Sequence, residues 1–323
     1  MAKSWKEWEK PLIELDEALT KLRQAAQTVE PSRRAELEAR IQEFEKRRDN
    51  YIEIKYSRLG PWEKVLVARA ETRPYTLDYI SMIFEDFVEL DGDRRFGADH
   101  AILGGPAMLD GQSCMVIGHQ KGRNLHDRQF RNFAMAKPEG YRKAIRLMEI
   151  ADRFGLPVIT FVDTPAADPG VESESRGISE AIAASMLKMF ELRVPIVSVI
   201  IGEGGSGGAI GIAAANSVLM QEHSIYSVIP PEGCAAILWR QPEKGAQAAA
   251  ALRLTAQSAL ELGLIDEILP EPFGGAHRDP VEAAEIVRRI MCGHLDTLCK
   301  MSGSALKEHR YEKFRAMGQF TEA

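Results

Sequence analysis

The sequence predicts an α/β protein whose parallel β-sheet is covered by helices on both faces. Residues 157–162 and 195–201 are nearly continuous apolar runs, which are typical of strands that are buried on both sides. Helical segments separate these runs, as parallel strands require. The 323 residues, 45% hydrophobic and 27% charged, suffice for one large domain or two smaller ones and exclude a wholly disordered protein.

Residues 1–58 are predicted to form an N-terminal helical hairpin. This part contains no glycine and is rich in Glu, Lys, Arg, Leu and Ala. Pro31 ends the first helix, because proline disfavours helix in the residue before it. Packing on its own domain and contact with a partner subunit are both compatible with this hairpin. Apolar residues recur at alternating spacings of three and four along the first helix, as in a coiled-coil seam: Leu12, Leu15, Leu19, Leu22, Ala26 and Val29.

Residues 59–275 are predicted to form the main domain, in which strands alternate with helices. Asp110 and Gly111 make a strong turn pair between strands 101–109 and 113–119. Gly263 is expected to cap the helix before it. Residues 276–323 are predicted to be a C-terminal tail of one or two helices. The other expected helices are 138–154, 174–192, 245–254 and 256–262, and the other expected strands are 157–162, 195–201, 217–221, 225–229 and 264–269.

Composition excludes several function classes. No stretch approaches the roughly 20 apolar residues that cross a bilayer, and the first residues lack a signal-peptide hydrophobic region. A net charge of −6 argues against nucleic acid as the main partner. The four cysteines form no CxxC pair, so we expect no metal in this chain and a cytoplasmic location.

The most informative segment is the glycine-rich turn 201–211 (IGEGGSGGAIG), which follows an apolar strand directly. Glycines at such a turn leave backbone N–H groups uncovered and allow a ligand to approach the main chain. Those N–H groups suit an oxyanion or a phosphate.

Three interpretations of this turn compete with the one that we favour. Gly202, Gly204 and Gly207 match a dinucleotide fingerprint with Glu222 following, but the helical piece of about eight residues is short for a crossover. A tight turn that only packs a helix on the sheet is the simplest alternative. A serine hydrolase would use Ser206 as the nucleophile of a GxSxG elbow, with Asp266 and His277 following in hydrolase order.

We favour an oxyanion hole that uses no side-chain nucleophile. In this interpretation the adjacent N–H groups of Gly207 and Gly208 bind an oxygen that becomes negative in the transition state. The sequence has no metal-ligand spacing and no P-loop. Backbone donors would therefore carry much of the catalysis.

Basic residues are concentrated between Lys121 and Arg146, a segment that contains eight basic residues and only two acidic ones. The excess favours attraction of an anionic ligand. A solvated helix face with salt bridges explains it equally well. Both interpretations stay open at the level of sequence.

Several long motifs, in order along nearly the whole chain, resemble one known family. The chain is similar to the alpha subunit of bacterial acetyl-coenzyme A carboxylase carboxyltransferase. The motifs that carry the resemblance are 73–79 (RPYTLDY), 118–123 (GHQKGR), 131–133 (RNF), 138–144 (PEGYRKA), 163–165 (DTP), 203–209 (EGGSGGA), 226–229 (YSVI) and 231–235 (PEGCA).

The resemblance implies a crotonase-like fold, as in ClpP and crotonase, built as a spiral of strand–strand–helix units. It also implies transfer of a carboxyl group from carboxybiotin to acetyl-CoA, which gives malonyl-CoA for fatty acid synthesis. The implied partners are a carboxyltransferase beta subunit that carries a zinc ribbon, a biotin carboxyl carrier protein and biotin carboxylase. An α2β2 assembly is expected, and the active site would be shared with the beta subunit.

By the same resemblance, Gly207 and Gly208 would hold the ureido carbonyl oxygen of biotin while the carboxyl group departs. A glycine pair on the beta subunit would stabilise the acetyl-CoA enolate. We predict substrate-binding roles for Gly204, Gly205, Lys121, Arg123 and Asp163.

One loop departs from the family pattern. After Asp-Thr-Pro the family usually has a glycine and an aromatic residue, whereas this chain has Ala166 and Asp168. A carboxylate beside the carboxyl group of a substrate would be unfavourable through like-charge repulsion. Substrate fit or rate is therefore an open question at this loop.

Overall fold

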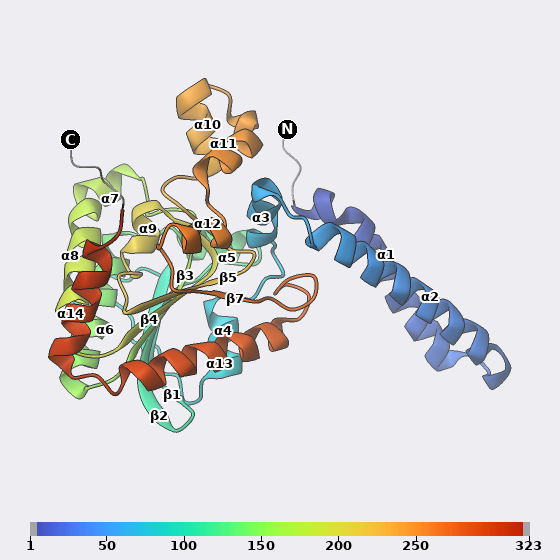
Figure 1. The fold of residues 1–323 in the computed structure, drawn as a ribbon, viewed down its shortest axis with the longest axis horizontal. Coiled ribbons are helices and arrows are strands. Elements are labelled where there is room, and N and C mark those ends of the chain that lie inside the picture. Colours follow the sequence, from blue (N-terminus) through green and yellow to red (C-terminus); the bar gives the residue numbers. More distant parts are fainter. Residues whose placement is uncertain (1–4, 319–323) are drawn as a thin grey trace.

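A seven-stranded β-sheet forms the centre of the protein (Figure 1), whose computed structural model describes residues 5–318. The strand order is β1-β2-β3-β4-β5-β7, and β6 pairs with β4. Among the strand pairs of the described residues, β1 and β2 are antiparallel and the others are parallel, as predicted. The strands are β1 (Ile102–Leu109), β2 (Gln112–His119), β3 (Val158–Thr164), β4 (Ile196–Gly205), β5 (Ser217–Gln221), β6 (Ile225–Ser227) and β7 (Glu267–Leu269).

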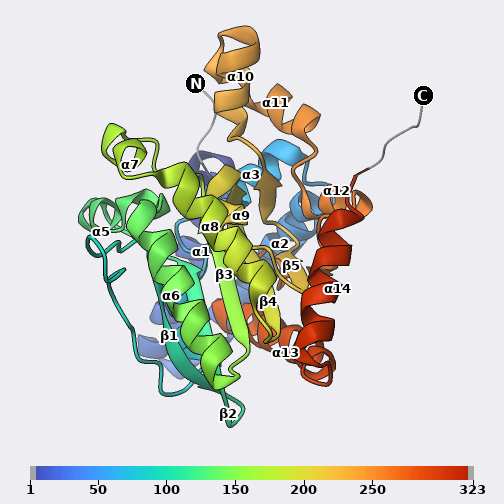
Figure 2. The same ribbon diagram turned by 90° about the vertical axis from the view of Figure 1, so that its left-hand side faces the viewer.

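Helices cover both faces of this sheet, which explains why its strands are apolar throughout. On one face, Ile117 and Ile196 pack in the same core as helices α6 (Pro138–Phe154) and α8 (Ile178–Glu191), which lie in front of the sheet in Figure 2. On the other face, Ile159 and Val197 share a core with α4 (Thr76–Ile83) and α13 (Pro280–Leu298). Alternate strand residues thus face different cores, and neither set can be polar.

Two antiparallel helices form the N-terminal hairpin, α1 (Trp5–Thr28) and α2 (Pro31–Tyr56). The chain breaks between them at Pro31, as predicted, and residues 1–4 of the expected hairpin lie outside the described residues. Figure 1 shows the hairpin extending away from the sheet. At its base, Glu9 lies 3.3 Å from His277 and 3.6 Å from Arg278, so this end is fixed to the main domain.

Most of the predicted elements are present, with some corrections. Asp110 and Gly111 both have positive φ, 50° and 79°, as their two-residue turn requires, and Gly263 has a φ of 69° at the expected helix end. The expected helix 174–192 is wrong, because Gly177 (φ 79°) divides it into α7 (Val171–Ser175) and α8. The strands expected at 225–229 and 264–269 are shorter, since only β6 and β7 pair there.

Short helices complete the fold, and most were not predicted individually. No helix within residues 5–318 is both long and apolar enough to cross a membrane. The tail forms two helices, and residues 319–323 of it lie outside the described part. The remaining elements are α3 (Pro61–Ala68), α5 (Leu125–Phe130), η1 (Asn132–Ala134), α9 (Ser206–Ile210), α10 (Pro231–Trp239), η2 (Pro242–Lys244), α11 (Gly245–Leu252), α12 (Ala256–Glu261) and α14 (Gly303–Arg315).

Candidate functional site

The site begins where the pairing of β3 and β4 becomes irregular at their carboxyl ends. Val162 pairs with Ile200, but Thr164 pairs with Gly204, so extra residues of β4 bulge between these pairs. At this bulge, side chains form hydrogen bonds with backbone groups that have no partner on the neighbouring strand. Oδ1 of Asp163 accepts the N–H of Glu203 at 2.9 Å, and Nε of Arg73 donates to the carbonyl of Ile201 at 2.8 Å.

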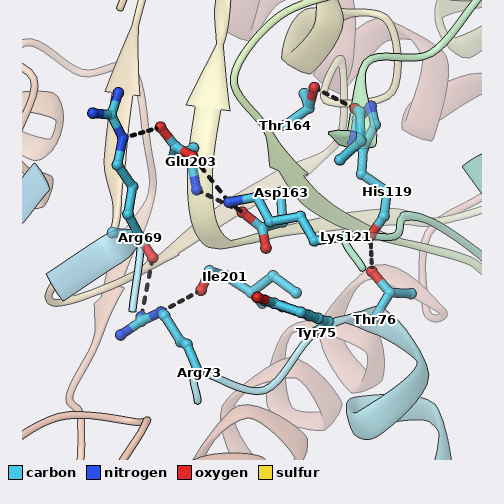
Figure 3. A network of polar contacts seen from close by, with 12 residues as sticks. Arg69, Arg73, Tyr75, Thr76, His119, Lys121, Asp163, Thr164, Ile201 and Glu203 are labelled. Carbon is cyan, nitrogen blue, oxygen red and sulfur yellow. Dashed lines mark hydrogen bonds and ion pairs between the residues drawn. The ribbon is translucent and has the colours of Figure 1, made fainter. Parts of the chain in front are cut away.

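A buried group of charges surrounds this bulge (Figure 3). Nζ of Lys121 lies 2.6 Å from Oδ1 of Asp163 and 3.0 Å from Oε2 of Glu203. Nε of Arg69 lies 2.7 Å from the other oxygen of Glu203, and Arg69 also pairs with Glu232 of α10. Lys121 thereby connects the segment after β2 with the ends of β3 and β4.

These contacts control the protonation of the group. Burial alone would raise the pKa of Glu203, but Lys121 and Arg69 lower it to about 2, so this carboxylate is ionised. Burial would lower the pKa of Lys121, but Asp163 and Glu203 raise it. Burial raises the pKa of Asp163 against the opposing effect of Lys121.

The glycines of the turn are required for different reasons. A Cβ on Gly205 would lie 1.9 Å from the carbonyl oxygen of Pro165, and one on Gly208 would lie 2.6 Å from the backbone of Ala166. These two glycines allow the turn to pack closely on the loop after β3, so the simple packing interpretation accounts for them. A Cβ on Gly207 would meet only the side chain of Ile182, at 3.3 Å. Gly207 is therefore the glycine that packing does not explain.

Helix α9 does not itself bond two N–H groups of this turn. Helix α9 begins at Ser206, which has a φ of 52°, and its first turn contains Gly207 and Gly208. The N–H groups in the first turn of an α-helix have no acceptor within the helix itself, so α9 does not bond those of Gly207 and Gly208. Gly207 lines a cavity of about 280 Å³, whereas Gly208 is buried. At least one of the two predicted catalytic glycines thus borders a ligand-sized space.

Three consecutive residues in left-handed conformation lie beside the loop after β3. Asn132, Phe133 and Ala134 have φ values of 43°, 55° and 62°. The carbonyl of Ala134 accepts a hydrogen bond from Oγ1 of Thr164 at 2.6 Å. Such backbone strain is concentrated at functional sites. The motif 131–133 drew attention to this segment, but the sequence did not reveal its conformation.

Asp168, which departs from the family pattern, is hydrogen-bonded by Asn132 of this left-handed segment and by Ser173 of α7. Its Oδ1 accepts a hydrogen bond from Asn132 at 3.2 Å, and its Oδ2 bonds the hydroxyl of Ser173. The carboxylate therefore has donors of its own. The expected effect of Asp168 on substrate fit stays a prediction.

The other predicted cations have partners as well. Arg123 pairs with Asp78, donates to the carbonyl of Glu71 at 2.7 Å and lies 4.4 Å from the ring centroid of Tyr75. Each of the eight basic side chains between 121 and 146 contacts a carboxylate or a backbone carbonyl. This supports the salt-bridge interpretation of the basic excess, and binding of substrate by Lys121 or Arg123 stays a prediction.

His119 is a buried residue whose surroundings were not predicted. Its side chain is fully buried, and neither ring nitrogen has a hydrogen-bond partner within the described residues. Burial, together with the positive charge of Lys121, lowers its pKa to about 3. His119 is therefore neutral at physiological pH.

The residues of the hydrolase interpretation are not brought together. His277 contacts Glu9 and Tyr56 at the base of the hairpin, and Asp266 pairs with Lys313. Among the described residues, neither hydrogen-bonds Ser206, so neither is placed to activate it as a base. The dinucleotide interpretation also lacks support, because α9 has only five residues. No group of three His, Cys, Asp or Glu side chains in the described range could hold a metal ion.

Comparison with known proteins finds relatives along nearly the whole chain. The family model described as acetyl co-enzyme A carboxylase carboxyltransferase-like matches residues 5–318. The chain is 53% identical over 316 residues to the acetyl-coenzyme A carboxylase carboxyl transferase subunit alpha of Geobacter metallireducens, with 98% of each chain covered. The chain belongs to this family of carboxyltransferase alpha subunits. The subunit of the same name from Thermus thermophilus is 50% identical, covering 98% of this chain and 99% of that one.

Solved structures show the same crotonase-like fold. Transcarboxylase 12S, crystallised with methylmalonyl-coenzyme A, matches with a TM-score of 0.58 at 17% identity, over 80% of this chain and 45% of that one. A Pseudomonas malonate decarboxylase hetero-tetramer matches with a TM-score of 0.54 at 19% identity, over 67% of this chain and 86% of that one. The predicted fold class is confirmed. The chain is an alpha subunit of a multi-subunit carboxyltransferase, as the family resemblance implied.

Proposed function

We propose that the turn 205–208 binds the ureido carbonyl oxygen of carboxybiotin during transfer of its carboxyl group to acetyl-CoA. The observation that carries the proposal is the position of Gly207 and Gly208 in the first turn of α9, where the helix itself does not bond their N–H groups, together with the cavity that Gly207 lines. Two such donors stabilise an oxygen that gains negative charge, and loss of one typically raises a barrier by about 3 kcal/mol. Carboxybiotin, when bound, supplies the carboxyl group.

The buried charges around the bulge have a positioning role in this proposal. Lys121 holds Asp163 and Glu203, which lie at the ends of the two strands that carry the loop and the turn. Fixing both strand ends fixes the distance between Gly208 and the loop on which it packs. The substrate site is then shaped through the backbone by Gly204, Gly205 and Asp163. Arg123 contributes to substrate binding from the neighbouring surface. We propose this role for Lys121 in place of direct substrate binding.

The proposal needs a carboxyltransferase beta subunit, a biotin carboxyl carrier protein and biotin carboxylase as partners. Exposed apolar side chains after β6 and on α10 support docking of the beta subunit. Val228, Ile237 and Leu238 are 74%, 72% and 63% exposed, and Val228 also lines the cavity beside Gly207. A partner that covers these side chains would close the cavity and complete the shared site of an α2β2 assembly. Leu238→Asp should then prevent co-purification with the beta subunit.

The decisive experiment co-expresses this chain with its beta subunit and measures malonyl-CoA decarboxylation with free biotin. Gly207→Val should lower the rate about 100-fold or more, because the side chain obstructs the donors. Gly293→Val is the matched control, since a side chain on Gly293 meets no atom within 4 Å. An inactive but well-assembled wild-type complex would refute the proposal.

A further inference from the structure

Helix α14 of the C-terminal tail reaches the cavity beside the glycine turn. Phe314 and Met317 line the same cavity as Gly207, although they lie more than 100 residues further along the chain. The rest of its wall is largely apolar, including Ile210, Val228 and Leu264. A cavity of about 280 Å³ with this lining suits a compact apolar ring that has one polar edge.

Buried polar contacts hold α14 in place. Arg310 is fully buried and donates to the carbonyl of Val194 at 3.1 Å, just before β4 begins. Nδ2 of Asn216 donates to the carbonyl of Leu306 at 3.0 Å, and Lys313 donates to the carbonyl of Asn216 at 3.2 Å. The helix is thus tied to the starts of β4 and β5, the strands that support the turn.

Phe314 itself is fixed by an aromatic neighbour. Its ring meets that of Phe190 on α8 edge-on, with centroids 5.3 Å apart. Ile182 of the same helix is the side chain closest to a Cβ placed on Gly207. Helix α8 therefore supports both the turn and the aromatic wall. A ring held in this way has a defined position before any ligand arrives, which lowers the entropy cost of binding.

We infer that Phe314 and Met317 determine specificity for the carboxyl donor, by packing against the apolar fused ring of biotin while its carbonyl oxygen faces Gly207. This inference rests on the proposed function and extends it to a segment outside the predicted main domain. It assigns the tail a direct part in substrate selection. The acetyl-CoA side of the reaction is not affected by these two residues.

The test uses the complex of this chain with its beta subunit and free biotin as the probe. Phe314→Ala should raise the KM for biotin roughly tenfold and leave the KM for malonyl-CoA within twofold, because lost apolar contact in a pocket weakens one substrate only. Phe314→Leu should restore most of the affinity. Tyr311→Ala is the matched control, since Tyr311 is an exposed aromatic residue on the same helix. Thermal unfolding and size-exclusion chromatography show whether each variant is folded and assembled.

The outcomes are distinguishable. An active wild-type complex in which Phe314→Ala leaves the KM for biotin unchanged would overturn the inference alone. Equal increases in the KM for both substrates would also overturn it, because they would indicate a general distortion of the site. A wild-type complex that is assembled but inactive would overturn the proposed function and this inference with it.

Discussion

Lys121 and Asp163 form a buried ion pair, with Nζ and Oδ1 2.6 Å apart, and the same carboxylate oxygen accepts the N–H of Glu203. One side chain thus neutralises a charge and also completes the backbone hydrogen bonding of the bulge. The bulge brings the loop after β3 against the glycine turn. The pair therefore connects the stability of the fold with the geometry of the site.

Replacing this lysine should be costly. Lys121→Met leaves two buried carboxylates without their shared cation, and we expect a loss of about 3 to 5 kcal/mol in the free energy of unfolding. Chemical denaturation of the purified chain measures it. Lys137→Met is the control, because Lys137 lies 4.0 Å from Glu172 at the surface, and it should lose less than about 1 kcal/mol. Equal losses in the two variants would contradict a structural role for the buried pair.

His119 should make the protein sensitive to acid. Burial holds its folded-state pKa at about 3, below the ordinary value of 6.5. The unfolded chain therefore binds a proton first, so the stabilising contribution is complete above pH 6.5 and is lost as the pH falls toward 3. The slope is about 1.4 kcal/mol per pH unit.

His119→Leu should remove this dependence. Between pH 6.5 and pH 5, the wild type should lose about 2 kcal/mol more stability than the variant. Denaturation curves at the two pH values measure the difference. His126→Leu is the control, because the side chain of His126 is 92% exposed. A parallel loss of stability in the wild type and His119→Leu would show that other groups dominate.

Ser206 separates the oxyanion mechanism from nucleophilic catalysis. Ser206→Ala should keep most of the decarboxylation activity of the complex, because the backbone donors remain. Ser206→Gly should raise the free energy of unfolding by about 1 kcal/mol, since a φ of 52° is unfavourable for serine. Ser227→Ala, which removes another hydroxyl from the cavity wall, is the control. Loss of nearly all activity in Ser206→Ala alone would revive the hydrolase interpretation.

The two central glycines should differ in their tolerance of a methyl group. Gly208→Ala forces the loop of Ala166 and Ala167 to move and should cost about 1 to 3 kcal/mol in stability, together with activity. Gly207→Ala meets only a flexible isoleucine side chain and should change stability by less than about 1 kcal/mol. Thermal denaturation of the two variants side by side measures the contrast. A larger effect at Gly207 would refute the packing account of Gly208.

Local patterns predicted the elements that have strong signals of their own. The bounds 138–154 of α6 are those of the expected helix, because Pro138 begins it and Gly155 (φ 70°) ends it. Short helices such as α3 and α4 have only eight residues each, too few for a clear period. Gly177 was read as part of a longer helix, since a single glycine inside a helical pattern is often tolerated.

The glycine turn could be predicted, but its surroundings could not. Its composition pointed to uncovered N–H groups, and the structure places Gly207 and Gly208 in the first turn of α9, with Gly207 lining a cavity. That Lys121 lies between Asp163 and Glu203 depends on the register of three strands that are distant in sequence. Side-chain contacts of this kind arise only from tertiary structure. The aromatic wall from α14 was missed for the same reason.

The shared contacts of Lys121 also bear on how this segment evolves. Loss of Lys121 alone leaves Asp163 and Glu203 without their shared cation. Loss of either acid leaves Lys121 with one of its two carboxylate partners. Single replacements are therefore disfavoured intermediates, whereas simultaneous exchange of all three keeps the interior balanced. Among related chains, these positions should co-vary as a unit even where the surrounding surface drifts freely.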